Sequence, residues 1–397
     1  MSNDKFCYLD NNATTRPAPE VVDAMLPYLR EQWGNPSSAY RFGRKVNAAI
    51  ETAREQVAAL INASPREIIF TSGGTESNNA AIHSALVAHP GKRHIVTTAV
   101  EHSATLNFSK ALQKLAYEAT FLPVESDGSL DIHLLHQSIR PDTALVTVML
   151  ANNETGILFP LEEIAAICRA KGVLCHTDAV QAAGKIPLDV RALGVSMLSL
   201  SAHKLHAPKG IGCLYVRQGV PYHPFVIGGG QERRRRGGTE NVPYIVAFGR
   251  AAELAQASLR EGQTRVRALR DRLENSLIKS IPGVHRTGQK EPRLPNTSNL
   301  AFEGVEAEAV LHLLDQAGIC ASSGSACTTG SLEPSHVLTA MGLSPERARS
   351  CIRLSLGTDT TEADIEHALK HFPQIIARLR GERPAKNISP QPAVPVG

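Results

Sequence analysis

The chain has 397 residues, 42% hydrophobic and 20% charged, a composition typical of an enzyme with a large buried core. Its 42 basic and 38 acidic side chains give a net charge of +4, which is too balanced to favour nucleic acid as a partner. No apolar run reaches the roughly 18 residues of a membrane span, and the N-terminus does not resemble a secretion signal. The seven cysteines are scattered and never spaced as C-x-x-C. We therefore expect a cytoplasmic protein without a metal site, a disulfide framework or membrane contact.

Apolar runs alternate with amphipathic segments from about residue 45 to residue 260. Residues 67–71 predict a strand and residues 76–89 a helix, and residues 94–98 and 103–116 repeat this order. The apolar run 144–150 predicts another strand, followed by a helix that opens at Pro160 and stops at Gly172. Three further short strands are predicted at 173–176, 197–200 and 213–216. This order predicts a mainly parallel, doubly wound α/β sheet, which binds ligands at the carboxyl ends of its strands.

The composition changes after about residue 260, where residues 264–281 predict a long, charged amphipathic helix. Short strands and helices follow it. We predict a large domain over 15–260 and a smaller α+β domain made of 1–14 together with 261–382. Residues 383–397 contain four prolines and few apolar side chains, so we predict a flexible tail there.

A Gly-Gly pair links the first strand to its helix in the segment TSGGTE, residues 71–76. Backbone N–H groups in such a turn, together with the helix N-terminus, can bind an anion such as a phosphate. A tight turn with Thr75 as helix cap explains the segment equally well. Because the spacing matches neither a Walker loop nor a dinucleotide fingerprint, the segment favours a single phosphate over a nucleotide.

Two other strand ends carry residues suited to an aldehyde cofactor. The segment SLSAHKLHAPKG places Lys204 at the end of a strand, among other basic side chains that would make it an amine nucleophile. Such a lysine can form a Schiff base, although a basic surface cluster is the alternative. Asp178 follows the strand at 173–176 and would pair with a protonated pyridine nitrogen, while Gln181 would reach a ring hydroxyl. A helix cap is the alternative role for Asp178.

Four more residues are candidates for the same site. His102 follows the strand at 94–98 and Asn153 follows the strand at 144–150, where they would contact a ring and a substrate, unless both are structural. Cys327 lies among small polar residues in SSGSACTTGS, as suits an exposed nucleophile, although an unremarkable exposed thiol is the alternative. Arg353 suits a substrate carboxylate, or else a structural ion pair.

Segments along nearly the whole chain closely resemble those of the NifS-type cysteine desulfurases of the class V aminotransferase group. They occur in the same order and include YLDNNATT, TSGGTES, HTDAVQAAGK, SAHKLHAPKG, GGGQERRRRGGTEN and SSGSACTTGSLEPSH. The resemblance implies a type I fold of the pyridoxal-phosphate-dependent transferases and a homodimer with active sites near the subunit interface. One departure is Arg234, where the family usually has glycine, so the resemblance does not predict the conformation of that loop.

The resemblance also implies residue roles. Lys204 would bind pyridoxal 5'-phosphate covalently, and Cys327 would become a persulfide. The implied cofactor contacts are Gly74, Thr75, Ser201, His203 and the partner subunit's Thr239 for the phosphate, Asp178 for the pyridine nitrogen, Gln181 for the ring oxygen and His102 for ring stacking. Asn153 and Arg353 would bind the substrate carboxylate.

The implied reaction converts L-cysteine to L-alanine. Lys204 would remove the α-proton, Cys327 would attack the substrate sulfur, and an acceptor protein would take the sulfur for iron–sulfur cluster assembly, with nitrogenase maturation as the expected use. Because a thiol of pKa ~8.5 is mostly protonated at neutral pH, we expect His102 to take its proton. The alternatives are another pyridoxal-phosphate reaction, such as that of a selenocysteine lyase or an aminotransferase, and a non-enzymatic iron–sulfur scaffold or sulfur-binding protein.

Overall fold

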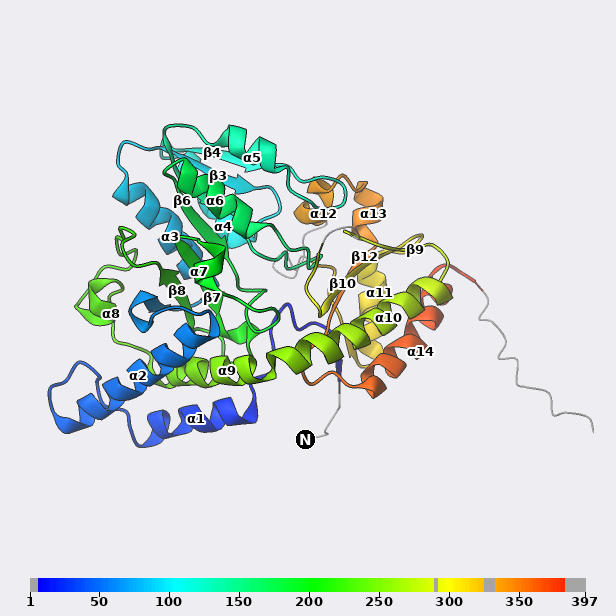
Figure 1. Cartoon of the computed structure of the whole chain (residues 1–397). Coiled ribbons are helices and arrows are strands. Elements are labelled where there is room, and N and C mark those ends of the chain that lie inside the picture. Colours follow the sequence, from blue (N-terminus) through cyan, green and yellow to red (C-terminus); the bar gives the residue numbers. More distant parts are fainter. Residues whose placement is uncertain (1–5, 289–291, 325–332, 383–397) are drawn as a thin grey trace, which may run out of the picture.

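The computed structural model describes residues 6–288, 292–324 and 333–382, so the predicted nucleophile Cys327 and the predicted tail lie outside the described residues. A large hydrophobic core surrounds a seven-stranded sheet, and a smaller core surrounds a three-stranded sheet (Figure 1). In the part of the chain that is described, no helix combines the length and the apolar character needed to cross a bilayer.

The large sheet is mainly parallel, as the sequence predicts. In spatial order its strands are β2 (Ile68–Thr71), β8 (Gly212–Val216), β7 (Met197–Ser201), β6 (Leu174–Asp178), β5 (Thr143–Thr147), β3 (His94–Thr98) and β4 (Glu118–Leu122). The strands from β7 to β4 run parallel, and β8 is antiparallel to both of its neighbours.

Two predicted strand ends are wrong by two or three residues. Strand β5 ends at Thr147 and not at residue 150, because its partner β3 already ends at Thr98 and leaves β5 with one neighbour. Strand β6 continues past residue 176 to Asp178, so this carboxylate belongs to the last residue of the strand.

Alternating side chains of the sheet enter two different cores, as the period of two in a strand requires. Ile69, Ile95 and Leu145 pack on one face with α3 (Gly74–Ala88) and α4 (Ser103–Gln113). Phe70 and Val146 pack on the other face with α2 (Arg41–Leu60), α6 (Leu161–Ala170) and α9 (Val242–Glu261). The remaining helices of this part are α1 (Pro19–Arg30), α5 (Ile132–Ser138), α7 (Val190–Leu193) and α8 (Gln231–Arg234).

The smaller core contains an antiparallel sheet in the order β12 (Cys351–Ser355), β10 (Thr297–Phe302) and β9 (Val284–Arg286). It is covered by α10 (Arg267–Ser280), α11 (Ala307–Gln316) and α14 (Glu362–Leu379), and α12 (His336–Ala340) and α13 (Pro345–Arg349) precede β12. The N-terminal strand β1 (Cys7–Tyr8) joins this part by pairing with β11 (Ile319–Cys320). The exact domain boundaries stay a prediction.

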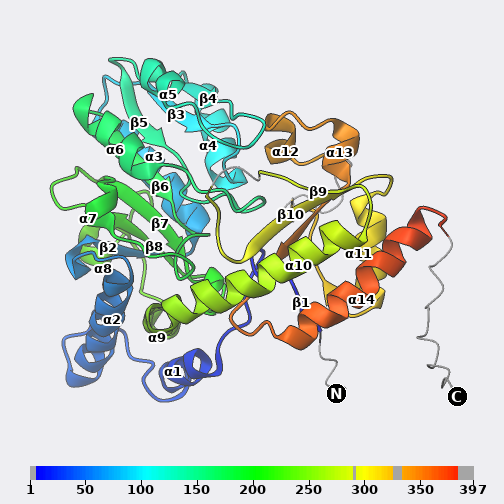
Figure 2. The ribbon, with the colours of Figure 1, turned by 45° about the vertical axis from the view of Figure 1, so that its right-hand side comes forward.

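One long helical segment connects the two cores. Helix α9 continues through a π-helical turn at Gly262–Val266 directly into α10. Figure 2 shows this segment passing from beneath the large sheet to the front of the smaller one. The predicted helix at 264–281 is therefore the second half of a longer one, and the change in composition at residue 260 does not mark a loop.

Arg234 lies in a turn that is held by a buried ion pair. Glu232, Arg233 and Arg234 all have positive φ angles, of 45°, 58° and 64°, in the left-handed region that favours glycine. The Glu232 carboxylate receives two hydrogen bonds from the Arg54 guanidinium, at 2.7 and 2.8 Å, and one from the backbone N–H of Phe70 at 2.9 Å. These contacts offset the strain of the turn, and the loop needs no glycine at position 234.

Candidate active site

A cavity of about 430 Å³ opens at the carboxyl ends of the parallel strands, where such sheets bind ligands. All ten cofactor and substrate residues that the sequence predicts from one subunit line it: Gly74, Thr75, His102, Asn153, Asp178, Gln181, Ser201, His203, Lys204 and Arg353. Thr239, which is predicted to contact the phosphate in the partner subunit, is exposed and does not line the cavity of its own chain.

Lys204 ends the short 3-10 turn that follows β7. Its Nζ donates hydrogen bonds to the backbone carbonyls of Asn12 and Ala13, the second at 2.6 Å. Because the N-terminal segment supplies both acceptors, the amine is held inside the cavity. The alternative of a basic surface cluster does not describe Lys204.

The Asp178 carboxylate is buried and oriented by two hydrogen bonds. Oδ2 accepts from Nδ2 of Asn78 at 2.6 Å, and Oδ1 accepts from the backbone N–H of Val180 at 2.9 Å. The residues after Asp178 form turns and not a helix, so the alternative role as a helix cap is wrong. Asn78 belongs to α3 and lines the cavity, and the sequence analysis did not identify it.

The Gly-Gly turn forms the start of α3, which begins at Gly74 with Gly73 as N-cap and no side-chain cap. Thr75 is therefore not the cap. A Cβ atom at Gly74 would lie 2.9 Å from Cγ2 of Val180, closer than such contacts allow. Since a long helix leaves its first N–H groups without helical partners, the turn suits a phosphate.

His102 is the N-cap of α4, where its Nδ1 accepts a hydrogen bond from the backbone N–H of Ala104 at 3.1 Å. Burial lowers the pKa of His102, Lys204 and His336 lower it further, and Asp178 raises it. Because Nδ1 accepts the bond from Ala104, the neutral ring carries its proton on Nε2, and the flat ring suits stacking on a flat cofactor. Burial likewise lowers the pKa of His203 to about 4.

The substrate side of the cavity is built around Arg353 in β12. This side chain is only 2% exposed, and its Nη2 donates to Oδ1 of Asp10 at 2.7 Å. Nη1 donates to the carbonyls of Asn153 and Gly324 at 3.1 and 3.3 Å. Among the described residues its buried Nε has no hydrogen-bond partner, so this N–H remains for a ligand. The structure thus contains the ion pair with Asp10, and the carboxylate-binding role of Arg353 stays a prediction.

Three further lining residues were missed. The Asn12 carbonyl accepts from Lys204, the buried Glu154 accepts from Ser335 at 2.5 Å, and Nε2 of His336 donates to the Glu101 carbonyl at 2.9 Å. Burial raises the pKa of Glu154. Asn12 lies within YLDNNATT and His336 within SSGSACTTGSLEPSH. Both segments resemble those of the NifS-type family, and that resemblance could have identified the two residues.

Glu101 lies fully buried directly before His102, and burial raises its pKa from 4.5 to about 8. Oε1 accepts from Thr98 and from the N–H of Met149, whereas Oε2 has no hydrogen-bond partner in the described part of the chain. The protonated carboxyl therefore contributes stability that is complete below pH 4.5 and is lost as the pH rises through about 8.

We expect Glu101→Gln to match the wild type in acid and to exceed its free energy of unfolding above pH 8 by roughly 2 kcal/mol or more. The amide has the shape of the protonated carboxyl but cannot ionise. Urea unfolding at several pH values measures the difference, with the exposed Glu163→Gln as the control. Parallel stability curves for Glu101→Gln and the wild type would contradict it.

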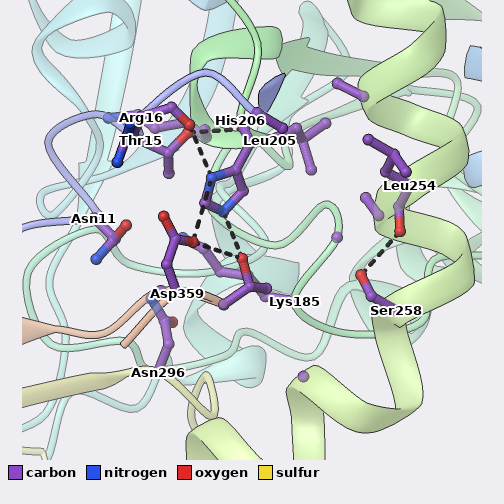
Figure 3. Close-up of a pocket in the computed structure, with 18 of the residues that line it drawn as sticks. Asn11, Thr15, Arg16, Lys185, Leu205, His206, Leu254, Ser258, Asn296 and Asp359 are labelled. Atoms are coloured by element: carbon purple, nitrogen blue, oxygen red, sulfur yellow. Dashed lines mark hydrogen bonds and ion pairs between the residues drawn. The ribbon is translucent and has the colours of Figure 1, made fainter. Parts of the chain in front are cut away.

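A second cavity of about 400 Å³ adjoins the first, and Lys204 lines both. Figure 3 shows Leu254 and Ser258 of α9 on one side and Asp359 on the other, with His206 between them. Nδ1 of His206 donates to the Arg16 carbonyl at 3.0 Å, and its Nε2 lies 3.1 Å from the Thr358 hydroxyl. Lys185 also lines this cavity.

Comparisons with known proteins agree with this geometry. The family model "aminotransferase class-V" matches residues 7–368. A cysteine desulfurase of Nostoc sp. is 54% identical over 380 residues, which cover 96% of this chain and 95% of the relative. The cysteine desulfurase NifS of Azotobacter vinelandii is 49% identical over 378 residues, or 95% of this chain and 94% of the relative.

Solved structures show the same architecture. A NifS-like protein has a TM-score of 0.89 and 39% identity, and the match covers 94% of this chain and all of that one. The structure described as SspA in complex with cysteine has a TM-score of 0.79 and 36% identity, covering 88% of this chain and 98% of that one.

The chain belongs to the class V aminotransferase family and has the type I fold of pyridoxal-phosphate-dependent transferases. Within that family it groups with the NifS-type cysteine desulfurases, and it is a pyridoxal-phosphate-dependent enzyme. The cavity fits this cofactor, because it combines a helix N-terminus for the phosphate, an oriented carboxylate for the pyridine nitrogen and a lysine amine for the aldehyde.

Proposed function

We propose that this enzyme converts L-cysteine to L-alanine and transfers the sulfur to its own Cys327. The observation that carries the proposal is the meeting of Lys204, Asp178 and Arg353 in one cavity. It joins an amine nucleophile, an oriented carboxylate and a buried guanidinium that suits an amino-acid carboxylate. The cysteine-bound structural relative SspA and the cysteine desulfurase relatives support this substrate.

Each side chain has a distinct task in this proposal. Pyridoxal phosphate, when bound, withdraws electrons from the amino acid and makes its α-proton acidic. Lys204 removes that proton, Asp178 keeps the pyridine nitrogen protonated, and Arg353 with Asn153 orients the substrate carboxylate. His102 stacks on the ring, and the N-terminus of α3 binds the phosphate.

The sulfur transfer requires the thiolate of Cys327. Its attack forms an S–S bond and breaks the C–S bond of the substrate, whose carbon keeps the electron pair and is then protonated to give alanine. The thiol proton was assigned to His102. That ring can accept it at Nδ1 only by losing its cap bond to Ala104. His336, whose Nε2 is the donor in its bond to the Glu101 carbonyl, has its other ring nitrogen as an acceptor when neutral and is a second candidate.

The proposal includes a homodimer in which the partner subunit's Thr239 completes the phosphate site, and a cytoplasmic acceptor protein that takes the persulfide sulfur. Its use in this proposal is iron–sulfur cluster assembly, and nitrogenase maturation in particular, in keeping with the similarity to the relative named NifS. Incubation of persulfidated enzyme with scaffold proteins, followed by mass spectrometry of the acceptor thiols, tests that use.

The deciding experiment for the reaction itself is Cys327→Ser. We expect the variant to bind pyridoxal phosphate normally but to form no persulfide, and to release alanine from cysteine at less than about 1% of the wild-type rate. Cys320→Ser, at a half-buried thiol on β11, is the control and should behave as the wild type. If Cys327→Ser releases alanine at the normal rate, another pyridoxal-phosphate reaction is favoured. If the wild type shows no absorption near ~420 nm, the protein is not this kind of enzyme.

A further inference from the structure

Lys185 connects the two sides of the active site without lining its cavity. Its Nζ donates to Oε1 of Gln181 at 2.8 Å and to Oδ1 of Asn12 at 3.0 Å. Both acceptors line the catalytic cavity, whereas Lys185 lines the second cavity (Figure 3). Lys185 therefore lies in the wall between the two cavities.

Two contacts, with Lys185 at one end and with the Asn12 backbone carbonyl at the other, determine which end of the Gln181 amide is the donor. Two N–H groups of a lysine amine point at two acceptors, so the amide oxygen of Gln181 must face Lys185 and its NH2 group must point away. Nε2 of Gln181 donates one of its two N–H groups to the Asn12 carbonyl at 2.9 Å. Among residues 6–288, 292–324 and 333–382 no other acceptor meets its second N–H, which suits an anionic oxygen bound in the cavity. In the flipped amide an oxygen would occupy that position and would repel such a ligand.

The same contact orients Asn12. Its Oδ1 accepts from Lys185 and from Nδ2 of Asn296 at 3.1 Å, so its Nδ2 is the donor toward the Asn153 carbonyl at 3.1 Å. The backbone carbonyl of Asn12 meanwhile accepts from Lys204. The Lys185 amine thus contacts Gln181 on the cofactor side and Asn12 on the other. Asn12 in turn holds Lys204 through its backbone carbonyl and Asn153, on the substrate side, through its side-chain amide.

We propose that Lys185 is a positioning residue that fixes the amide of Gln181, so that Gln181 donates a hydrogen bond to the ring oxygen of pyridoxal phosphate. This inference rests on the proposed function and on the contact between Gln181 and the ring oxygen that the family resemblance implies. Burial, with Lys204 and Arg353 nearby, lowers the pKa of Lys185 well below its usual value. The role does not depend on its charge, since a neutral amine keeps two N–H groups, one for each amide.

The test is Lys185→Met in the holoenzyme, which keeps the length of the side chain and removes its donors. Without the contact the Gln181 amide keeps its bond to the Asn12 carbonyl but loses the donor at its Oε1, so it is held less firmly and the anionic ring oxygen receives a weaker hydrogen bond. We expect the affinity for pyridoxal phosphate to fall roughly tenfold. We also expect the pH midpoint of the visible absorption to rise by about 0.5–1 unit, because the less stabilised ring oxygen holds the neighbouring Schiff-base proton more tightly. Dialysis equilibrium and spectral titration measure both quantities.

A double-mutant cycle with Gln181→Ala separates this role from a purely structural one. If Lys185 acts through Gln181, adding Lys185→Met to Gln181→Ala leaves the midpoint within about 0.2 unit of the Gln181→Ala value. Lys171→Met, at an exposed lysine that donates to the carbonyls of His136 and Ile139, is the control and should change neither quantity.

The outcomes distinguish two failures. A Lys185→Met enzyme with the affinity and midpoint of the wild type overturns this inference, and so does an equal shift in both backgrounds. A wild-type protein that binds no pyridoxal phosphate overturns the proposed function instead.

Discussion

Replacing Lys204 with alanine is expected to reduce alanine formation from cysteine by at least about a thousandfold. In our proposal this amine binds the aldehyde and also removes the α-proton, so the variant loses both the covalent bond and the base. Nζ of Lys204 already lies in the cavity, held by two backbone carbonyls. Added cofactor should still bind, because the phosphate turn, Asp178 and Gln181 remain, but the Schiff-base absorption should be absent.

Alanine release, counted per cofactor bound, measures this effect. Lys209→Ala is the matched control, since Lys209 comes from the same segment but is exposed and lines neither cavity described above. It should retain the activity and the absorption of the wild type. A Lys204→Ala variant that kept more than about one tenth of the activity would show that another group supplies the base.

Replacing Glu232 with glutamine is expected to lower the free energy of unfolding by about 3–5 kcal/mol. Both partners of the Arg54–Glu232 pair have side chains that are 3% exposed. Without the carboxylate, the Arg54 guanidinium keeps its ion pair with the half-exposed Glu51 at 3.1 Å but loses its buried partner, which water cannot replace. The glutamine also weakens the contact that holds three residues with positive φ in place.

Urea unfolding of the cofactor-free protein measures this loss. Arg250→Met is the control, because Arg250 and Glu253 form an ion pair on the exposed side of α9 and should contribute less than about 1 kcal/mol. The double variant Arg54→Met/Glu232→Gln should recover part of the loss, since it removes the uncompensated charge. An unfolding midpoint for Glu232→Gln equal to that of the wild type would show that the pair contributes no net stability.

The parts of the active site that could be predicted from the sequence lie next to a strand. Asp178 and Ser201 end strands, and Lys204 follows one closely, so an apolar run and a short count of residues were enough to place them at the edge of the sheet. The alternation of strands and helices likewise predicted the parallel sheet. The two misplaced strand ends depend on how far the neighbouring strand is paired, since β3 pairs with β5 up to Thr147 and β7 pairs with β6 up to Asp178.

The parts that could not be predicted act across long stretches of sequence. Asn12 meets Lys204 and Gln181 because the N-terminal segment passes between the two cores, and no local pattern encodes that path. Lys185 follows a strand end by only a few residues. Its function depends on which atoms of two amides it contacts, and this is a matter of three-dimensional geometry.

The contact between the first and last parts of the chain has a consequence during protein synthesis. The backbone N–H of Asn12 donates to Oγ of Ser355, and Asp10 pairs with Arg353, across a separation of 343 residues in both cases. A ribosome makes the N-terminal segment first, yet that segment cannot take its final place until β12 has emerged. The large sheet can form on the growing chain, but Lys204 acquires its carbonyl acceptors only near the end of translation. A truncated product that ends before β12 would therefore lack both the substrate arginine and the contacts that position the reactive lysine.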